Sequence, residues 1–498
     1  MNVAAEQQPL TKGQPASDLL ATSAAGPAAV RGGALRVGGY VVGMLVNAVS
    51  AALLFRHLGR VDTGRYVLAL SLVAIVAALS DLGLTAVGVR EMSARTSAER
   101  WVVARDLLGL RIALTVLGGA VVTAVAAWGY PGVLAAGVAF ACVGLLLQAT
   151  QDNFVLSLTV GLRLGWVAAL DFTRQLLTAL AILLLVLAGA GLLPFFTVSI
   201  PVGMIVLTLT LRLVRGTRAL SPTFDWGRWR PLVSAILPYS AAVAASAIYF
   251  RVSILLLSAL SNGYQVGYFG TSFRIIEVLT ILPALLVGAA LPIFARAAHG
   301  DHARFGYALE RVFEVALLAG AWVAVSIAVS APLAIALIGG PTFAPAAPVL
   351  AIQGVALGAM FVSLVWANAL LSLGLYRRIL WISLAMLALG ALLVTVLAPI
   401  DGARGAAIGT AIAEIVAAGL QALAVVRGRP DLRPSLRVVP RTALAAAAGL
   451  APLALTGLPV ILRLALSTLL YGIVVLALRA LPNELLSLLP DRIARRER

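Results

Sequence analysis

Charged residues are scarce in this chain. They make up 11% of its 498 residues, against about 25% in soluble globular domains, while hydrophobic residues reach 61%. Mean hydropathy is +1.02. A chain this apolar does not stay dissolved in water as a compact domain. The composition therefore predicts an all-α polytopic membrane protein.

Lysine, histidine and cysteine are also nearly absent. Lys12 in "LTKGQP" is the only lysine, so the chain has no GxxxxGK[ST] loop and cannot be its own ATPase. His57, His299 and His302 are not at metal-ligand spacing, so we expect no zinc site, no other metal and no cofactor. The single cysteine, Cys142, cannot form an internal disulfide and is expected to pack as a small hydrophobe.

Long apolar windows are abundant instead. About 20 residues are needed to cross the hydrocarbon core as a helix, and such windows occur fourteen times. They lie near 33–55, 66–90, 108–128, 131–157, 166–188, 190–214, 233–260, 267–295, 311–331, 345–373, 377–399, 404–426, 440–457 and 459–480. The last pair is short and the turn after 188 is tight, so twelve or thirteen crossings also fit. Residues 1–30 lack the pattern of a signal peptide and are predicted to be a disordered cytoplasmic tail.

Arginine sets the predicted orientation. With the amino terminus inside, the cytoplasmic connections collect most of the arginines, as the positive-inside rule requires. Only the loop at 56–65, with Arg56, Arg60 and Arg65, and Arg404 depart from this pattern. An even number of helices then returns the carboxyl terminus to the cytoplasm. The arginines on the predicted inner side are Arg90, Arg95, Arg100, Arg105, Arg212, Arg215, Arg218, Arg228, Arg230, Arg296, Arg304, Arg427, Arg429, Arg433, Arg437, Arg492, Arg495, Arg496 and Arg498.

The net charge of +17 is thus mainly a topology signal, with a preference for anionic lipid headgroups. Nucleic acid is not an expected partner. An enzyme is disfavoured too, because acid/base or metal chemistry on a glycan would need carboxylates in a substantial outward loop. The outward connections are short and hold essentially Asp62 and Asp401. A transporter is the default prediction.

An internal repeat suggests how the helices are grouped. The stretches 63–84 and 266–287, 203 residues apart, both open with glycine and a nearby aromatic residue and end before an arginine-bearing inner loop. The repeat predicts an amino-terminal lobe at 31–218, a carboxyl-terminal lobe at 219–428, and two further helices with a basic cytoplasmic tail at 429–498. Transporters commonly bind substrate between such halves. Glycine-aromatic openings are also common in membrane helices, so the similarity can arise without duplication.

Two signatures carry a family resemblance. "FRHLGRVDTGRYVLALSLVAIVAALSDLGLTAVGVREMS" resembles the first-loop and second-helix pattern of the Wzx-like polysaccharide flippases, a branch of the multidrug/oligosaccharidyl-lipid/polysaccharide (MOP) exporter superfamily. "YFRVSILLLSALSNGYQVGYFGTSFRIIEVLTILPALLVGAALPIFAR" is similar to the family's Y-x-R-x-D motif and R-x-x-E pair. Ser253 stands where that motif has aspartate. The first pattern is matched by Arg56, Leu58, Gly59, Gly64, Tyr66, Asp81, Leu82, Gly83, Leu84, Arg90 and Glu91.

The resemblance implies a MATE-like exporter fold of two six-helix lobes plus two carboxyl-terminal helices. It also implies a cargo, an oligosaccharide on a polyprenyl diphosphate, moved across the bacterial cytoplasmic membrane for cell-surface polysaccharide synthesis. Expected partners are that lipid-linked oligosaccharide, membrane lipids and the machinery that polymerises the glycan. By resemblance to the flippase of lipid-linked peptidoglycan precursors, the last two helices are expected to form a groove for the polyprenyl tail.

Arginines within the predicted membrane helices are the candidate cargo ligands. Arg251 and Arg274 fall at about the same depth in neighbouring helices, and an arginine facing lipid there costs at least about 2.5 to 3.5 kcal/mol. With Arg174 they are predicted to line the cavity, where a guanidinium fork suits a diphosphate. The alternative is an internal ion pair, because Arg274 and Glu277 stand at i and i+3.

A second charge layer is predicted near the inner ends of the first helices. It contains Asp81, Asp152 and Asp171, with Arg174 one turn after Asp171. One interpretation is a cation or proton site coupled to transport; the other is a structural ion-pair cluster that closes the inward gate. Glu414 in "GTAIAEIVAAG" is a lone acid with the same two interpretations.

Two other functions remain open at this point. A multidrug and toxin extruder of the same superfamily would carry cations and is expected to have an acid-lined lobe without cavity arginines. A membrane glycan polymerase or ligase would need a large outward loop. The sequence favours the flippase, working by alternating access.

The arginine pattern makes a direct prediction about orientation. Single cysteines placed near Ser261 or Thr342 should react with an impermeant thiol reagent in intact cells, whereas cysteines near Arg218 or Arg429 should react only after permeabilisation. The reverse labelling pattern would contradict the topology.

Overall fold

A computed structural model describes residues 25–130, 132–214, 221–297 and 302–481. Residues 25–30 already belong to the first helix, so the predicted disordered tail at 1–30 is wrong for its last six residues. The rest of that tail lies outside the described residues. So do Arg215, Arg218, His299 and the arginines at the carboxyl terminus.

The described chain is built of α-helices and short 3-10 turns, and none of it forms a strand. The helices are α1 (Ala25–Asp81), α2 (Leu84–Ser93), α3 (Ser97–Gly129), α4 (Val133–Val160), α5 (Leu164–Leu187), α6 (Leu192–Thr197), α7 (Ser199–Leu213), α8 (Trp226–Leu260), α9 (Gly263–Leu279), α10 (Ile281–Ala297), α11 (His302–Ile338), α12 (Ala346–Ser372), α13 (Tyr376–Gly428), α14 (Val438–Leu450) and α15 (Val460–Ala477). The 3-10 turns are η3 (Pro341–Phe343), η4 (Pro430–Leu432) and η5 (Ala451–Ala454).

Eleven candidate membrane spans occur among the described residues. Two of them, Leu45–Ser93 and Tyr376–Gly428, are 49 and 53 residues long, enough for two crossings each. Both contain a glycine with positive φ, Gly59 at 72° and Gly402 at 53°, that breaks the helix. These breaks fall between the crossings predicted at 33–55 and 66–90, and at 377–399 and 404–426. The fold class is confirmed, and the count of fourteen stays a prediction.

Local sequence explains several helix ends. Asp225 accepts the backbone N–H of Gly227 at 2.9 Å and caps α8, and Asn262 accepts that of Gln265 at 3.1 Å and caps α9. Both are preferred N-cap residues because their oxygens satisfy donors that the first helical turn leaves free. The Asp225 cap fixes where α8 begins, and the Asn262 cap fixes where the chain turns back from α8 into α9.

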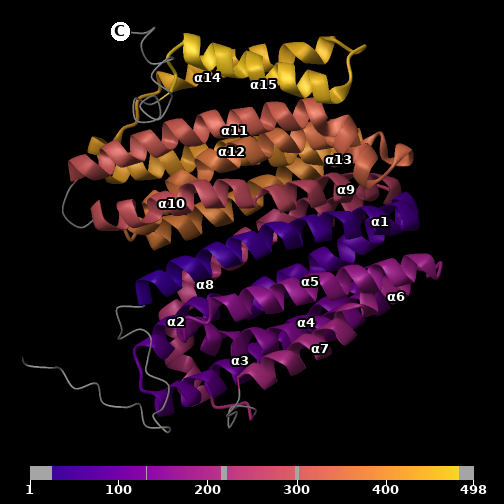
Figure 1. Ribbon diagram of the computed structural model, residues 1–498, viewed down its shortest axis with the longest axis vertical. Coiled ribbons are helices and arrows are strands. Elements are labelled where there is room, and N and C mark those ends of the chain that lie inside the picture. Colours follow the sequence, from indigo (N-terminus) through magenta and orange to yellow (C-terminus); the bar gives the residue numbers. More distant parts are fainter. Residues whose placement is uncertain (1–24, 131, 215–220, 298–301, 482–498) are drawn as a thin grey trace, which may run out of the picture.

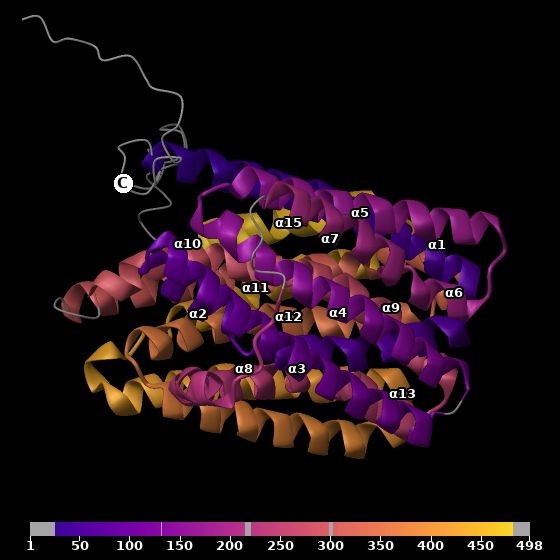
Figure 2. The same cartoon turned by 90° about the horizontal axis from the view of Figure 1, so that it is seen from below.

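The helices lie in two groups, which we call the first half (α1–α7) and the second half (α8–α13). In Figure 1, α3 to α7 lie below α1, α9 to α13 lie above it, and α14 and α15 form the top layer. Figure 2 shows the same helices running roughly side by side when seen from below. The α1 helix packs along both α5 and α9, so it is the main contact between the halves.

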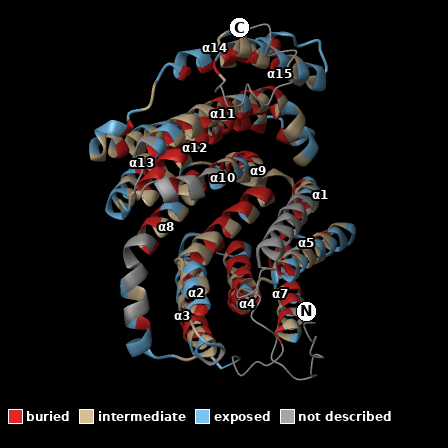
Figure 3. Cartoon of the chain, turned by 60° about the vertical axis from the view of Figure 1, so that its left-hand side comes forward, coloured by how far each residue is buried: buried red, intermediate tan, exposed pale blue. Residues whose placement is uncertain are grey.

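The largest apolar core lies in the second half. The α12 helix packs between α11 and α13, and Figure 3 shows buried residues concentrated along α11 and α12. Trp366 is 1% exposed and packs against the ring of Phe313. The α11 and α12 backbones approach closely at Gly320 and Gly358, where small residues permit tight helix packing.

The two halves meet at glycines that the internal repeat aligns. Gly64 of α1 and Gly267 of α9 stand 203 residues apart, the spacing of the repeat. A Cβ on Gly64 would lie 2.8 Å from the backbone nitrogen of Gly267 and 2.9 Å from the carbonyl oxygen of Gly263. A Cβ on Gly267 would lie 2.0 Å from the carbonyl oxygen of Arg60. Backbone therefore touches backbone at this crossing.

Alanine at this crossing should push the two helices apart. We expect Gly64→Ala to destabilise the purified protein by about 1–3 kcal/mol, as overpacking does, and Gly267→Ala to cost more because its Cβ is closer to backbone. Thermal unfolding in detergent measures the effect. Gly419→Ala is the control, since a Cβ there meets nothing within 4 Å. Equal melting temperatures for all three variants would contradict the close contact.

Candidate functional site

A charged cluster lies where α8, α9 and α1 meet. The carboxylate of Glu277 accepts hydrogen bonds from Arg251 through one oxygen and from Arg274, at 2.5 Å, through the other. The predicted i, i+3 pair of Arg274 and Glu277 is confirmed. Arg251 joins it from the neighbouring helix, as the equal depth of the two arginines suggested.

Side chains of α1 complete the cluster. Arg274 donates to the side-chain oxygen of Asn47 at 2.7 Å, and Arg251 donates to the hydroxyl of Ser71 at 3.4 Å. The Arg251 guanidinium also lies 5.2 Å from the ring centre of Phe273. An aromatic face stabilises a cation that has lost part of its water. The cluster therefore links both segments of α1 to α8 and α9.

A cavity of about 90 Å³ opens onto these charges. That volume holds a few water molecules, and it is well below the roughly 300–1,000 Å³ of sites that enclose a drug-sized ligand. In this conformation the two arginines bind Glu277, and only this small cavity lies beside them. The polar lining consists of Asn47, Ser50, Tyr66, Gln175, Thr178, Arg251, Arg274 and Glu277.

The acids of the first half lie apart from this cavity. Asp152 pairs with Arg174 at 3.8 Å, and Asp171 stands one turn before Arg174 on α5. Arg174 does not line the cavity of Arg251 and Arg274, so the structure does not bring these three predicted cavity cations together. Asp81 accepts from Arg111 at 2.6 Å and from Thr85 at 2.5 Å. Both ion pairs join helices within the first half, so neither bridges the halves as a closed gate would.

Sequence reasoning missed Arg111. It is 3% exposed, and it donates to Thr85 at 2.8 Å as well as to Asp81. A buried arginine must be paired, because an unpaired charge removed from water is costly. The signal was available: Arg111 lies inside the window 108–128, as Arg251 lies inside its own. The rule that drew attention to Arg251 applies equally to Arg111.

A second polar cavity, of about 40 Å³, lies within the second half. Ser253 hydrogen bonds with Thr410 at 2.9 Å, and Glu414 lines the same space from α13. Ser253 replaces the aspartate of the family pattern, and Glu414 supplies a carboxylate to this cavity. Gln353 is 2% exposed, and both polar atoms of its amide lack a hydrogen-bond partner among the described residues.

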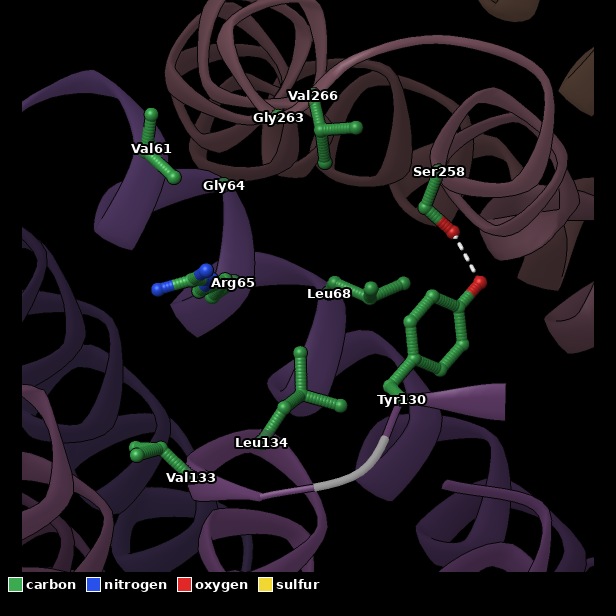
Figure 4. A pocket seen from close by; sticks show the side chains of 10 residues that line it. All are labelled: Val61, Gly64, Arg65, Leu68, Tyr130, Val133, Leu134, Ser258, Gly263 and Val266. Atoms are coloured by element: carbon green, nitrogen blue, oxygen red, sulfur yellow. Dashed lines mark hydrogen bonds between the residues drawn. The ribbon is translucent and has the colours of Figure 1, made fainter. Parts of the chain in front are cut away.

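A third cavity, of about 520 Å³, lies at the end of the bundle that contains Gly59. Figure 4 shows Tyr130 of the first half hydrogen bonded to Ser258 of the second, at 2.6 Å, with Leu68 and Leu134 beside the ring and Arg65 opposite. The hydroxyl pair connects the two halves across this cavity.

The arginines that break the predicted positive-inside pattern have partners at this end. Arg56 donates to the carbonyl oxygens of Ala336 and Leu337, at 3.0 and 2.7 Å, near the carboxyl end of α11. Arg60 donates to the hydroxyl of Tyr268 at 2.9 Å. Both contacts run from the first half to the second. These arginines hold the halves together at the Gly59 end.

The arrangement of helices is similar to that of known membrane transporters. No family model matches the sequence, and no curated protein matches it. Among solved structures, the chain is similar to the lipid II flippase MurJ in an inward closed conformation, with a TM-score of 0.67 and 12% identity over 88% of this chain and 97% of that one. It is also similar to the MATE multidrug transporter DinF-BH (0.58, 17%, 86% and 100%). A MATE transporter of the MOP superfamily in its inward-facing conformation gives 0.56, 15%, 78% and 94%.

Identities this low show the fold alone. The three solved structures share that fold, and each matches most of this chain. The predicted resemblance is confirmed at that level: the chain is a multi-pass membrane protein with the fold of the MOP-superfamily exporters.

Proposed function

We propose that this protein is a flippase that moves polyprenyl-diphosphate-linked oligosaccharide across the bacterial cytoplasmic membrane by alternating access, with both termini in the cytoplasm. The observation that carries the proposal is the pair of arginines from α8 and α9 that converge on one point between the halves. Two guanidinium groups directed at a shared acceptor form a site for an anion with several oxygens.

The surroundings suit a phosphate group better than a cationic drug. The cluster of two arginines and one glutamate carries a net charge of +1, and it lies among neutral hydrogen-bonding groups of Asn47, Ser50 and Gln175. A cationic drug would be repelled there. The multidrug extruder is therefore the weaker candidate, although transporters of that kind share the fold. A polymerase or ligase is weaker still, because the described loops between spans are short.

An apolar groove offers a place for the polyprenyl chain. It has a volume of about 450 Å³ and lies between α11, α12, α13 and α14. Its lining is rich in small apolar residues such as Ala321, Ala324 and Gly358, with Ala446 and Leu450 contributed by α14. A hydrocarbon chain in this groove would contact apolar side chains and would bury no polar side chain of the lining. We propose that the diphosphate binds at the arginines while the isoprenoid tail follows this groove.

Two substitutions of Arg251 distinguish the effect of its positive charge from the effect of its planar guanidinium geometry. Arg251→Lys keeps a cation but loses the planar fork, so we expect flipping to fall about tenfold or more, and Arg251→Ala should lose nearly all of it. Stability should change less than for a two-membered buried pair, because Glu277 keeps Arg274 at 2.5 Å. The measurement is flipping of lipid-linked oligosaccharide in proteoliposomes, normalised to folded protein.

The matched control is Arg311→Ala. Like Arg274 with Glu277, Arg311 forms an i, i+3 pair, with Glu314 at 2.7 Å, and it lies on α11 outside the cavity. It should flip lipid as the unaltered protein does. If well-folded Arg251→Ala also flips at the normal rate, the arginine has no part in transport and the proposal fails.

The tail groove makes a separate prediction. A chain truncated after residue 428 should insert but not transport, since α14 and its part of the groove are gone. A tryptophan at Ala446 should fill the groove and slow flipping in the full-length protein, whereas one at Ala447, on the exposed side of α14, should not. Full activity of both the truncation and Ala446→Trp would show that the groove is dispensable.

A further inference from the structure

Glu277 occupies the position of a ligand. Its two carboxylate oxygens each accept from a different arginine, one on α8 and one on its own helix. An anion that is to accept from the same N–H groups of Arg251 and Arg274 must therefore take the place of this carboxylate. The fold supplies an internal anion where the cargo would bind.

The displaced carboxylate does not leave. It remains attached to α9 beside the site, so it competes at the high effective concentration of a tethered group and repels any incoming anion. A ligand with one negative charge would replace one carboxylate-like contact by another and gain nothing. A diphosphate carries more charge and more oxygen acceptors, and it can bind both guanidinium forks at once.

Phosphodiester lipids surround the protein in great excess over any lipid-linked diphosphate. Each of their phosphate groups carries a single negative charge. An arginine pair without a counter-anion, at the boundary between the halves, would be open to occupation by these headgroups. Glu277 raises the charge that a ligand needs in order to enter.

We infer that Glu277 is a selectivity residue, whose tethered carboxylate admits diphosphate lipids and excludes the phosphodiester lipids of the bilayer. This inference rests on the proposed function and adds a role to its site. Loss of the carboxylate should widen the range of anions that bind, whereas a residue with a purely structural role would lower binding of all of them together.

The test compares two fluorescent probes, farnesyl diphosphate and phosphatidylglycerol, in equilibrium binding to the purified full-length protein. The unaltered protein should bind farnesyl diphosphate and discriminate against phosphatidylglycerol. Glu277→Gln should bind phosphatidylglycerol on the order of tenfold or more tightly than the unaltered protein does, the scale set by one charged hydrogen-bond competitor, and should still bind the diphosphate. Glu314→Gln, which removes the equivalent acid of the Arg311 pair, should keep normal selectivity.

The outcomes separate the inference from the function. Unchanged phosphatidylglycerol affinity in folded Glu277→Gln overturns the selectivity role, while diphosphate binding to the unaltered protein leaves the flippase proposal standing. Absence of diphosphate binding to the unaltered protein overturns both. If the variant does not fold, competition decides: excess phosphatidylglycerol that displaces farnesyl diphosphate from the unaltered protein contradicts the inference, and failure to displace it supports the inference.

Discussion

A permanent cation inside a membrane needs an anion within reach, and this requirement organises the centre of the molecule. An arginine at the middle of a lipid-facing helix costs at least about 2.5 to 3.5 kcal/mol. Arg251 and Arg274 avoid that cost by sharing Glu277, and the group is held on the other side by Asn47 and Ser71. Because the partners come from three different helices, satisfying the charges also fixes how α1, α8 and α9 meet.

The need to pair buried charges is also met inside each half. The ion pairs of Asp81 with Arg111 and of Asp152 with Arg174 are internal to the first half. The cavity with Ser253, Thr410 and Glu414 is internal to the second. The central cluster and the contacts at the Gly59 end cross between the halves, and so do the pair of Arg228 with Asp106, at 3.6 Å, and the hydrogen bond from Ser240 to the carbonyl oxygen of Leu82. The internal ion pairs and the Glu414 cavity are thus satisfied within one half each, and a limited set of polar contacts joins the halves, which is the arrangement expected if the halves move as bodies.

Much of this was predictable from sequence, because membranes make strong local demands. Length and hydropathy located the helices, and the glycine breaks at Gly59 and Gly402 fall in predicted loops. The pair of Arg274 and Glu277 followed from helical spacing alone. The contact of Arg251 with Glu277, by contrast, depends on how α8 and α9 pack. Arg174 pairs with Asp152 in the predicted inner charge layer and does not line the cavity of Arg251 and Arg274, because depth along a helix does not determine which face a side chain occupies.

The glycine crossing of α1 and α9 has a mechanical consequence. Most helix contacts interlock, because side chains of one helix fill spaces on the other, and turning one helix about the other requires those side chains to be withdrawn. At Gly64 and Gly267 there are no side chains to withdraw. Val61 and Val67 pack onto Gly263 and Gly270 to either side, so the bare contact is confined to this one point. A rotation of one helix over the other therefore meets the least side-chain resistance here, at the end where Arg56 and Tyr130 join the halves.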